Sequence, residues 1–342
     1  MTDTAGDREG LIAAFLAAAG WQAARREPLA RDASFRRYDR LYRDGETAVL
    51  MDAPPPTENV AAFHQVNLIL RGLGLSAPEP YAVDEDAGLM LLEDLGDQTF
   101  TRVLNGGGDA AALYRTATDL LIALHRRYQV PDAGGDVLPS YDDSRLLGEA
   151  ALFTDWYMPA VLGASTPPEV RTAYIEGWRA ALAAARAVPD SLVLRDYHVD
   201  NLMVVAGRDG VSACGLLDFQ DAVIGPITYD LVSLLEDARR DVSAALASEM
   251  IDRYLSAFPG LDRAAFAASY AVLGAQRSAK IIGIFTRLCR RDGKPVYLKH
   301  IPRVWRWLEG DLEHPALAEM RDWFARAVPA DKRVTPSTEG AA

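Results

Sequence analysis

The chain has 342 residues, of which 49% are hydrophobic and 25% are charged, and its formal net charge is −12. This length allows a large core divided between two domains, and the acidic charge argues against nonspecific binding to nucleic acid or to anionic membranes. Two cysteines make no disulfide framework, the N-terminus lacks a signal peptide and no apolar run reaches the length of a membrane span, so the sequence favours a cytoplasmic protein.

The first hundred residues are predicted to mix helices and strands. A short amphipathic helix is expected over Glu9–Ala19. Strands are expected over Leu29–Leu41 and Ala48–Met51, and a helix over Thr57–Leu73 begins with Thr57 as its cap. The apolar run Leu89–Leu92 predicts a buried strand.

Helical periodicity dominates the rest of the chain. One helix is expected over Asp109–Tyr128, and another passes through Glu149 and Tyr157. Apolar residues that recur every three to four positions predict further helices over residues 169–188, 227–242, 244–258, 262–291, 301–312 and 317–327. The tail from Pro329 to Ala342 is small and polar, and it is predicted to be disordered.

Three short apolar runs carry polar residues at their ends. The runs are Leu192–Leu194, Leu202–Val205 and Cys214–Leu217, and their length predicts buried strands. Asp196 and Asn201 lie in the loop between the first two runs, and Asp218 closes the third. Phosphoryl transfer uses such a set: one carboxylate faces the acceptor hydroxyl, while an amide oxygen and a second carboxylate hold Mg²⁺. The pattern indicates Asp196 as the catalytic base, with Asn201 and Asp218 as Mg²⁺ ligands.

Two other interpretations of this loop are open. The string from Asp196 to Asn201 could be a metal-free turn rich in Asp and Asn. Alternatively, Asp196, His198 and Asp200 could bind a transition metal, although no cluster of His or Cys supports that site. We expect His198 to brace the loop by hydrogen bonding and Asp200 to be a solvated turn residue.

The two polar strings resemble the motifs of the aminoglycoside phosphotransferase/choline kinase family. That family typically shows H-G-D-x-H-x-x-N and then [IL]-D-F-x-D. The chain reads D-Y-H-V-D-N from Asp196 and L-D-F-Q-D from Leu217, and residues 224–232, I-G-P-I-T-Y-D-L-V, also match. It departs from the family at Leu194–Arg195, where His-Gly is usual.

The resemblance implies a two-lobed, protein-kinase-like α+β fold, with ATP and Mg²⁺ as cofactors. Residues 1–92 would form a small, mixed N-terminal lobe that binds the nucleotide. Residues 93–328 would form a large, mostly helical lobe that carries catalysis and acceptor binding, and residues 329–342 would be the disordered tail. No D-F-G, activation loop or A-P-E segment follows Asp218, which argues against protein substrates.

The nucleotide-binding residues implied by the resemblance are Ser34, Arg36, Arg37, Glu93 and Leu95. The family's third-strand lysine is absent, because residues 48–52 read A-V-L-M-D. Arg36 or Arg37 would meet the phosphate charge instead, since side chains alternate along a strand and one must point inward; otherwise both lie on a solvated edge. Ser34 would donate to a phosphate or sit in an ordinary hairpin turn. Backbone groups at Glu93 and Leu95 would bind adenine.

The acceptor-binding residues implied by the resemblance lie in the second lobe. They are Tyr141, Asp142, Glu149, Trp156, Tyr157, Asp221, Arg277 and Lys280. Aromatic faces suit sugar rings, although Trp156 could equally belong to ordinary helix packing. A local basic cluster comprises Arg287, Arg290, Arg291, Lys294 and Lys299. Such a cluster is usually a solvated face, but near the acceptor it would favour an anionic substrate.

Five further strings are similar to a subfamily of bacterial anomeric sugar kinases that acts in cell-wall recycling. They are S-F-R-R-Y (34–38), L-M-D-A-P-P (50–55), L-L-E-D-L-G-D (91–97), F-T-D-W-Y (153–157) and G-A-Q-R-S-A-K-I-I-G-I-F (274–285). This similarity implies a monomer without nucleic-acid or membrane partners that phosphorylates N-acetylmuramate and N-acetylglucosamine at C1. Two alternatives stay open: a kinase for choline, an amino alcohol or an aminoglycoside, and a nucleotide-binding pseudokinase regulator, which the missing lysine would explain.

Overall fold

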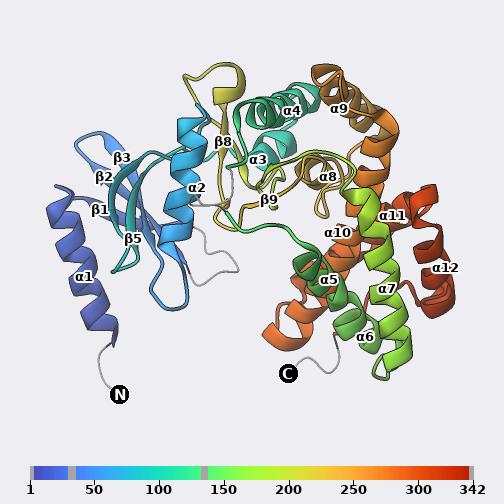
Figure 1. The fold of residues 1–342 in the computed structure, drawn as a ribbon. Coiled ribbons are helices and arrows are strands. Elements are labelled where there is room, and N and C mark those ends of the chain that lie inside the picture. Colours follow the sequence, from blue (N-terminus) through green and yellow to red (C-terminus); the bar gives the residue numbers. More distant parts are fainter. Residues whose placement is uncertain (1–3, 30–35, 132–137, 339–342) are drawn as a thin grey trace. The chain divides into compact units, whose positions relative to one another are not determined.

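The computed structural model describes residues 4–29, 36–131 and 138–338 (Figure 1). The chain forms two compact units. The first comprises Met1–Leu120 and Val199–Asp221, and the second comprises Leu121–His198 and Ala222–Ala342. This is a different division from the predicted lobes, whose boundary between residues 92 and 93 stays a prediction.

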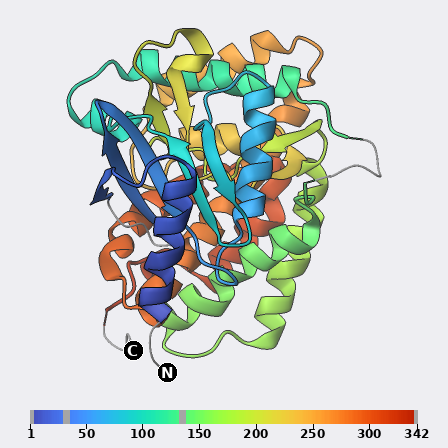
Figure 2. The ribbon, with the colours of Figure 1, turned by 90° about the vertical axis from the view of Figure 1, so that its left-hand side faces the viewer.

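The first unit contains a five-stranded antiparallel sheet in the order β1-β2-β3-β5-β4. Its strands are β1 (Arg25–Pro28), β2 (Arg37–Arg43), β3 (Glu46–Asp52), β4 (Pro80–Asp84) and β5 (Leu89–Glu93). The helices α1 (Thr4–Ala18) and α2 (Val60–Gly72) lie on opposite sides of this sheet in Figure 1, and Figure 2 shows α1 in front of the strands.

Side-chain alternation explains why the sheet is covered on both faces. Ala48 and Leu50 of β3 join Ile12 and Leu16 of α1 in one apolar cluster, while Met51, which points the other way, is also fully buried. A strand buried on both faces needs a continuous apolar run, which is what residues 48–51 supply.

The cap of α2 differs from the prediction. Thr57 is not the cap; Asn59 Oδ1 accepts a hydrogen bond from the backbone N–H of Ala62 at 3.2 Å. Both residue types accept such bonds, so the sequence alone did not distinguish two candidates two positions apart.

The rest of the first unit places the predicted metal ligands. It contains α3 (Phe100–Asn105), the start of α4 (Ala110–Arg127), β7 (Leu202–Val204), the 3₁₀ turn η2 (Gly210–Ala213) and β8 (Cys214–Leu216). The strands β7 and β8 pair antiparallel, with Leu202 opposite Leu216. This pairing brings the residues just before β7 beside those just after β8.

The second unit is mostly helical and is built around α10 (Arg263–Asp292), which packs against α5, α7 and α11. Its other elements are α5 (Asp143–Leu152), the π-helical turn η1 (Phe153–Tyr157), α6 (Met158–Leu162), α7 (Pro168–Ala185), α8 (Tyr229–Leu235), α9 (Ala244–Ala257), η3 (Pro295–His300), α11 (Ile301–Leu312), η4 (Pro315–Leu317), α12 (Ala318–Ala327) and η5 (Ala330–Lys332). A two-stranded pair, β6 (Asp190–Val193) with β9 (Val223–Pro226), completes it.

Two predicted segments in this unit differ in the structure. The helix expected over residues 227–242 ends at Leu235, because Glu236 leaves the helical conformation. The tail expected to be disordered is folded as far as the described residues extend: Lys332 and Val334 accept hydrogen bonds from the Tyr157 hydroxyl through their backbone carbonyls, and Arg333 pairs with Glu309 at 2.7 Å. Composition alone did not reveal these backbone contacts. None of the helices within the described ranges is both long and apolar enough to cross a bilayer.

Candidate active site

The two predicted metal ligands, Asn201 and Asp218, lie together in the first unit. The Asn201 side-chain nitrogen is 3.4 Å from Asp218 Oδ2, and the backbone N–H of Leu217 donates to the Asn201 carbonyl at 3.0 Å. Gln220 donates to Asp218 Oδ1 at 2.9 Å. Asp218 has a φ of 58°, in the left-handed region that residues other than glycine rarely adopt. Such strained backbone concentrates at functional sites, where it aims a side chain.

The donor set at this position fits a magnesium ion. Mg²⁺ is usually held by one or two protein oxygens together with substrate phosphates, and the neighbouring side chains of Asp218 and Asn201 contain one carboxylate and one amide oxygen. The transition-metal alternative finds no support within the described ranges, because no group of three His, Cys, Asp or Glu residues there could hold a metal ion. Asp200 instead accepts a hydrogen bond from the Thr101 hydroxyl.

Arg36 lies beside the predicted metal ligand Asp218, while Arg37 points elsewhere. The Arg36 guanidinium pairs with Glu58 at 3.1 Å and reaches Asp218 at 3.6 Å, and its side chain is 10% exposed. Arg37 pairs with Asp52 and is 49% exposed. The prediction that one of the two arginines points inward is therefore confirmed: Arg36 faces inward and Arg37 faces outward. Ser34 lies outside the described residues.

Glu93 and Leu95 occupy the end of β5 and the segment that follows it. The Glu93 backbone N–H donates to the Glu79 carbonyl at 2.8 Å, and its carboxylate pairs with Arg208. Leu95 packs with Met203 and Val205 in a small apolar cluster. An apolar patch next to main-chain polar groups suits a flat heterocycle such as adenine. Adenine binding by both residues stays a prediction.

Asp196 belongs to the second unit and is ionised. Burial alone would raise the pKa of its carboxyl group, but nearby positive charges, Lys280 first, outweigh burial and lower the pKa. Arg195 and Arg277 act in the same direction. An ionised carboxylate is the form that accepts a proton, as the prediction for Asp196 requires.

The backbone before Asp196 is held in place by Asp230 at the start of α8. Its carboxylate accepts from the N–H of Leu194 at 2.6 Å and from the N–H of Arg195 at 2.9 Å, and Ser233 donates to the Arg195 carbonyl at 3.2 Å. Arg195 has a φ of 69°, a conformation suited to glycine. The family resemblance places glycine at this position, so the arginine keeps the glycine-like backbone and adds a charged side chain.

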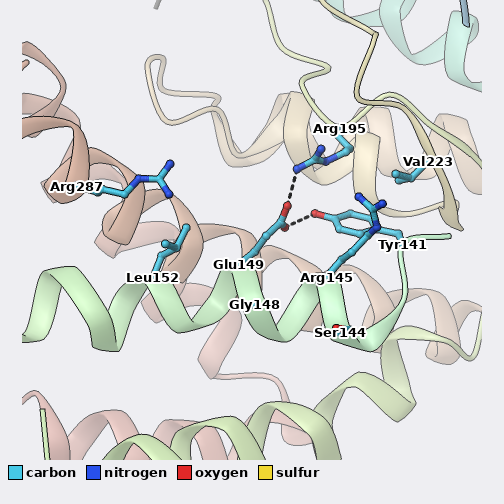
Figure 3. Close-up of a pocket in the computed structure, with 9 residues that line it drawn as sticks. All are labelled: Tyr141, Ser144, Arg145, Gly148, Glu149, Leu152, Arg195, Val223 and Arg287. Carbon is cyan, nitrogen blue, oxygen red and sulfur yellow. Dashed lines mark hydrogen bonds and ion pairs between the residues drawn. The ribbon is translucent and has the colours of Figure 1, made fainter. Parts of the chain in front are cut away.

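The side chain of Arg195 enters a network around Glu149. Glu149 of α5 pairs with Arg195 and, at 3.0 Å, with Lys280 of α10, and it accepts from the Tyr141 hydroxyl at 2.5 Å (Figure 3). Burial would raise the pKa of Glu149, but Lys280 and Arg195 lower it. These predicted residues, Tyr141, Glu149 and Lys280, thus lie together.

This network borders a pocket of about 340 Å³ in the second unit. Its lining residues are Tyr141, Ser144, Arg145, Gly148, Glu149, Leu152, Arg195, Val223 and Arg287 (Figure 3). Because Lys280 both pairs with Glu149 and lowers the pKa of Asp196, the same positive charge acts on the pocket and on the Asp196 carboxylate.

Of the eight predicted acceptor residues, Tyr141 and Glu149 line this pocket; besides Lys280 and Asp221, four others do not. Asp142 caps α5 by accepting from the N–H of Arg145 at 2.8 Å, and Trp156 is half-buried in η1. Tyr157 is buried, and its hydroxyl is used by Trp305 and the C-terminal backbone. Arg277 is 5% exposed and donates to Ser233 at 2.9 Å.

Because the polar atoms of Tyr157 and Arg277 are already used inside the protein, the structure corrects their assignment as acceptor contacts. Asp221 belongs to the first unit, where its charge acts on Arg36. The carboxylate of Asp221 therefore contributes to the surroundings of the metal position.

Five residues around these two places were not among the predicted site residues: Arg195, Arg145, Arg287, Glu58 and Asp230. For two of them, the sequence motifs contained a signal. Arg195 stands where the family motif has glycine, and Asp230 belongs to the matched string 224–232. For Arg287, only the local density of positive charge pointed to this region.

The fold is shared with known small-molecule kinases. A choline/ethanolamine kinase family protein from Mesorhizobium loti aligns with a TM-score of 0.60 over 92% of this chain and 98% of its own, at 17% identity. The ADP-bound aminoglycoside phosphotransferase APH(2'')-Ib aligns with a TM-score of 0.55 over 86% of this chain and 94% of its own, at 15% identity. Together they show a protein-kinase-like fold, and they confirm the predicted α+β architecture.

Comparisons of sequence find relatives with much higher identity than these solved structures. The chain belongs to the phosphotransferase enzyme family, which matches residues 25–267. A relative from Caulobacter vibrioides, named N-acetylmuramate/N-acetylglucosamine kinase, is 40% identical over 96% of this chain and 98% of its own. A relative of the same name from Pseudomonas aeruginosa is 38% identical over 87% of each chain. The family predicted from the two motifs is confirmed.

Proposed function

We propose that this protein is an ATP-dependent kinase that phosphorylates N-acetylmuramate and N-acetylglucosamine at the anomeric hydroxyl in peptidoglycan recycling. The observation that carries the proposal is the similarity to relatives with those substrates in their name, at 36–40% identity over 82–96% of this chain. The intact set of Asp196, Asn201 and Asp218 supports an active enzyme.

In this proposal the first unit supplies the nucleotide groups. Bound by Asn201 and Asp218, Mg²⁺ would neutralise the charge that develops on the transferring phosphoryl group. Arg36 would take the place of the missing third-strand lysine, and Glu58 would hold it, as a glutamate usually holds that lysine. Main-chain groups at Glu93 and Leu95 would contact adenine, and Leu95 would cover it with Met203.

Asp196 would orient the acceptor hydroxyl and accept its proton. An anomeric hydroxyl is more acidic than other sugar hydroxyls, and the loose transition state of phosphoryl transfer needs little activation of the nucleophile. A single carboxylate whose pKa is lowered is therefore a sufficient base, because it is ionised at neutral pH.

Product analysis tests the proposal most directly. The purified protein, Mg·ATP and each amino sugar should yield a glycosyl 1-phosphate detectable by phosphorus NMR, with ADP released in equal amount. Choline and an aminoglycoside serve as comparison acceptors and should give no product. A 6-phosphate would refute the anomeric position, and turnover of choline or of the aminoglycoside alone would refute the sugar assignment.

The proposal includes a cytoplasmic, monomeric enzyme. Cys214 and Cys289 are buried free thiols, as in proteins of a reducing compartment. Size-exclusion chromatography with light scattering would test the monomer. The pseudokinase alternative loses its main motivation, because the Arg36–Glu58 pair offers a cation where the lysine is missing.

A further inference from the structure

The pocket beside Glu149 carries more positive than negative charge. Three guanidinium groups line it, those of Arg145, Arg195 and Arg287, against the single carboxylate of Glu149. In the view of Figure 3, Arg287 and Arg145 lie on either side of Glu149. The three arginines come from three different parts of the second unit: α5, the segment after β6, and α10.

The partners of these arginines are distributed unevenly. Glu149 is already satisfied by Arg195, by Lys280 at 3.0 Å and by the Tyr141 hydroxyl at 2.5 Å. Among the described residues, the guanidinium groups of Arg145 and Arg287 have no ion pair. The buried Nε atom of Arg287 also has no hydrogen-bond partner there. Burial and the charge of Arg291 lower the pKa of Arg287, and they outweigh the opposing charge of Asp292.

The backbone at Arg195 adds an independent argument. A φ of 69° favours glycine, so a residue with a side chain is retained there at a conformational cost. Glu149 and the Tyr141 ring, whose centre is 5.5 Å from the Arg195 guanidinium carbon, hold this side chain at the pocket. Such an arrangement fixes a cation next to the catalytic residue Asp196, which follows in the chain.

We infer that this pocket is a carboxylate-binding subsite for the acceptor, in which Arg145 and Arg287 bind the carboxylate and Arg195 positions the sugar ring. The inference rests on the proposed function and deepens it: N-acetylmuramate carries a lactyl carboxylate, whereas N-acetylglucosamine does not. Arginine suits this task because its planar fork matches a carboxylate in two-point contact. The subsite sets the preference between the two sugars.

The test compares both sugars and the carboxyl methyl ester of N-acetylmuramate, which keeps the shape of the acceptor and removes its charge. For Arg287→Gln and Arg145→Gln, the ratio of kcat/KM for N-acetylmuramate to that for N-acetylglucosamine should fall roughly 10- to 100-fold. The activity on N-acetylglucosamine and on the ester should stay within about twofold, which also shows that each variant is folded. Arg291→Gln is the matched control, because Arg291 is exposed on the same helix and pairs with Asp292 at 2.7 Å.

Arg195→Gly is a second variant that does not depend on the first two. Glycine suits the φ of this position, and Glu149 keeps Lys280 and Tyr141 as partners, so the fold should be retained. Because both sugars share the ring that Arg195 positions, this variant should lower kcat/KM for the two sugars by a similar factor. Unequal losses in Arg195→Gly, equal losses on both sugars in Arg287→Gln and Arg145→Gln, or a wild-type enzyme that treats the ester like the acid would overturn the subsite.

Calorimetry separates a failure of the subsite from a failure of the proposed function. If the wild type phosphorylates neither sugar, the proposed function fails, but the binding of N-acetylmuramate can still be measured without turnover. Tighter binding of the acid than of the ester, lost in Arg287→Gln and kept in Arg291→Gln, would support the subsite. Equal binding of acid and ester would overturn it.

Discussion

Asp196 is a half-buried carboxylate whose pKa is lowered by Lys280 and other nearby positive side chains. In Asp196→Asn the proton acceptor is lost while the shape is kept, so kcat should fall by roughly 10²–10⁴. The dissociation constant of Mg·ATP should change by less than about threefold, because Asp196 is not a metal ligand in this scheme. Steady-state kinetics and calorimetry together measure both values. Turnover at the wild-type rate would remove Asp196 from the base role.

Arg36 and Arg37 provide a matched pair of neighbouring arginines. Arg36→Ala removes the cation that pairs with Glu58 at 3.1 Å, and it should weaken Mg·ATP binding roughly 10- to 100-fold. Arg37→Ala should leave nucleotide binding nearly unchanged, because Arg37 is 49% exposed and Asp52 keeps Arg8 as a partner at 2.6 Å. Titration of each variant with Mg·ATP gives the comparison. Equal affinities in the two variants would show that Arg36 does not serve the phosphates.

At the scale of single residues, the sequence predicted those neighbours that follow from short spacing along the chain or from side-chain alternation along a strand. Asn201 and Asp218 meet because a strand pair, β7 with β8, follows from two short apolar runs. The surroundings of Glu149 were beyond prediction in detail, because Arg195 and Lys280 reach it from distant parts of the chain. Tyr157 was assigned to the acceptor because its exposure could not be read from helical periodicity alone.

At the scale of elements, α8 acts as a support for the catalytic segment. Asp230 at its start accepts two backbone N–H bonds, from Leu194 and Arg195, and is 1% exposed. In Asp230→Asn only one oxygen can accept, so one of these N–H groups loses its partner. The free energy of unfolding should fall by about 1–3 kcal/mol.

The kinetic effect of Asp230→Asn distinguishes positioning from stability alone. Because the residue acts through the backbone of Arg195, kcat should fall by roughly tenfold or more at temperatures where the variant is fully folded, while the KM for ATP changes little. Denaturant unfolding and steady-state kinetics at the same temperature provide both measurements. A stability loss with kcat unchanged would mean that the contact supports only the fold.

Long elements with a strong repeat and short elements with an apolar run were predicted well. The helix expected over residues 262–291 matches α10, Arg263–Asp292. In contrast, β1, β4, β9 and α3 escaped prediction, because each has only four to six residues and none has the uninterrupted apolar run that marks β5 and β7. The four residues of β9 depend on pairing with β6, a tertiary contact that local sequence does not encode.

At the scale of the whole molecule, a pair of buried carboxyl groups should govern how stability depends on pH. The buried carboxyl groups of Glu236 and Asp311 lie close together, and Oε2 of Glu236 and Oδ2 of Asp311 have no hydrogen-bond partner among the described residues. Both groups pack against Gly274 of α10, where any side chain would collide with them. Burial raises the pKa of Glu236 to about 7, and burial together with Glu236 raises the pKa of Asp311 well above its ordinary value. The positive charge of Arg277 opposes the shift of the Glu236 pKa.

The direction of the pH effect follows from these raised pKa values. Between the ordinary pKa of a glutamate, about 4.5, and about 7, the folded protein binds more protons than the unfolded chain, so its stability should fall as the pH rises. Asp311→Asn removes the like charge beside Glu236. Relative to the wild type, this variant should gain about 1–3 kcal/mol more stability at pH 8 than at pH 5, so its free energy of unfolding should depend less steeply on pH. Urea unfolding at several pH values measures this change. Glu319→Gln, an exposed carboxylate on α12, is the control and should keep the wild-type slope. A steep slope retained in Asp311→Asn would place the pH dependence elsewhere in the molecule.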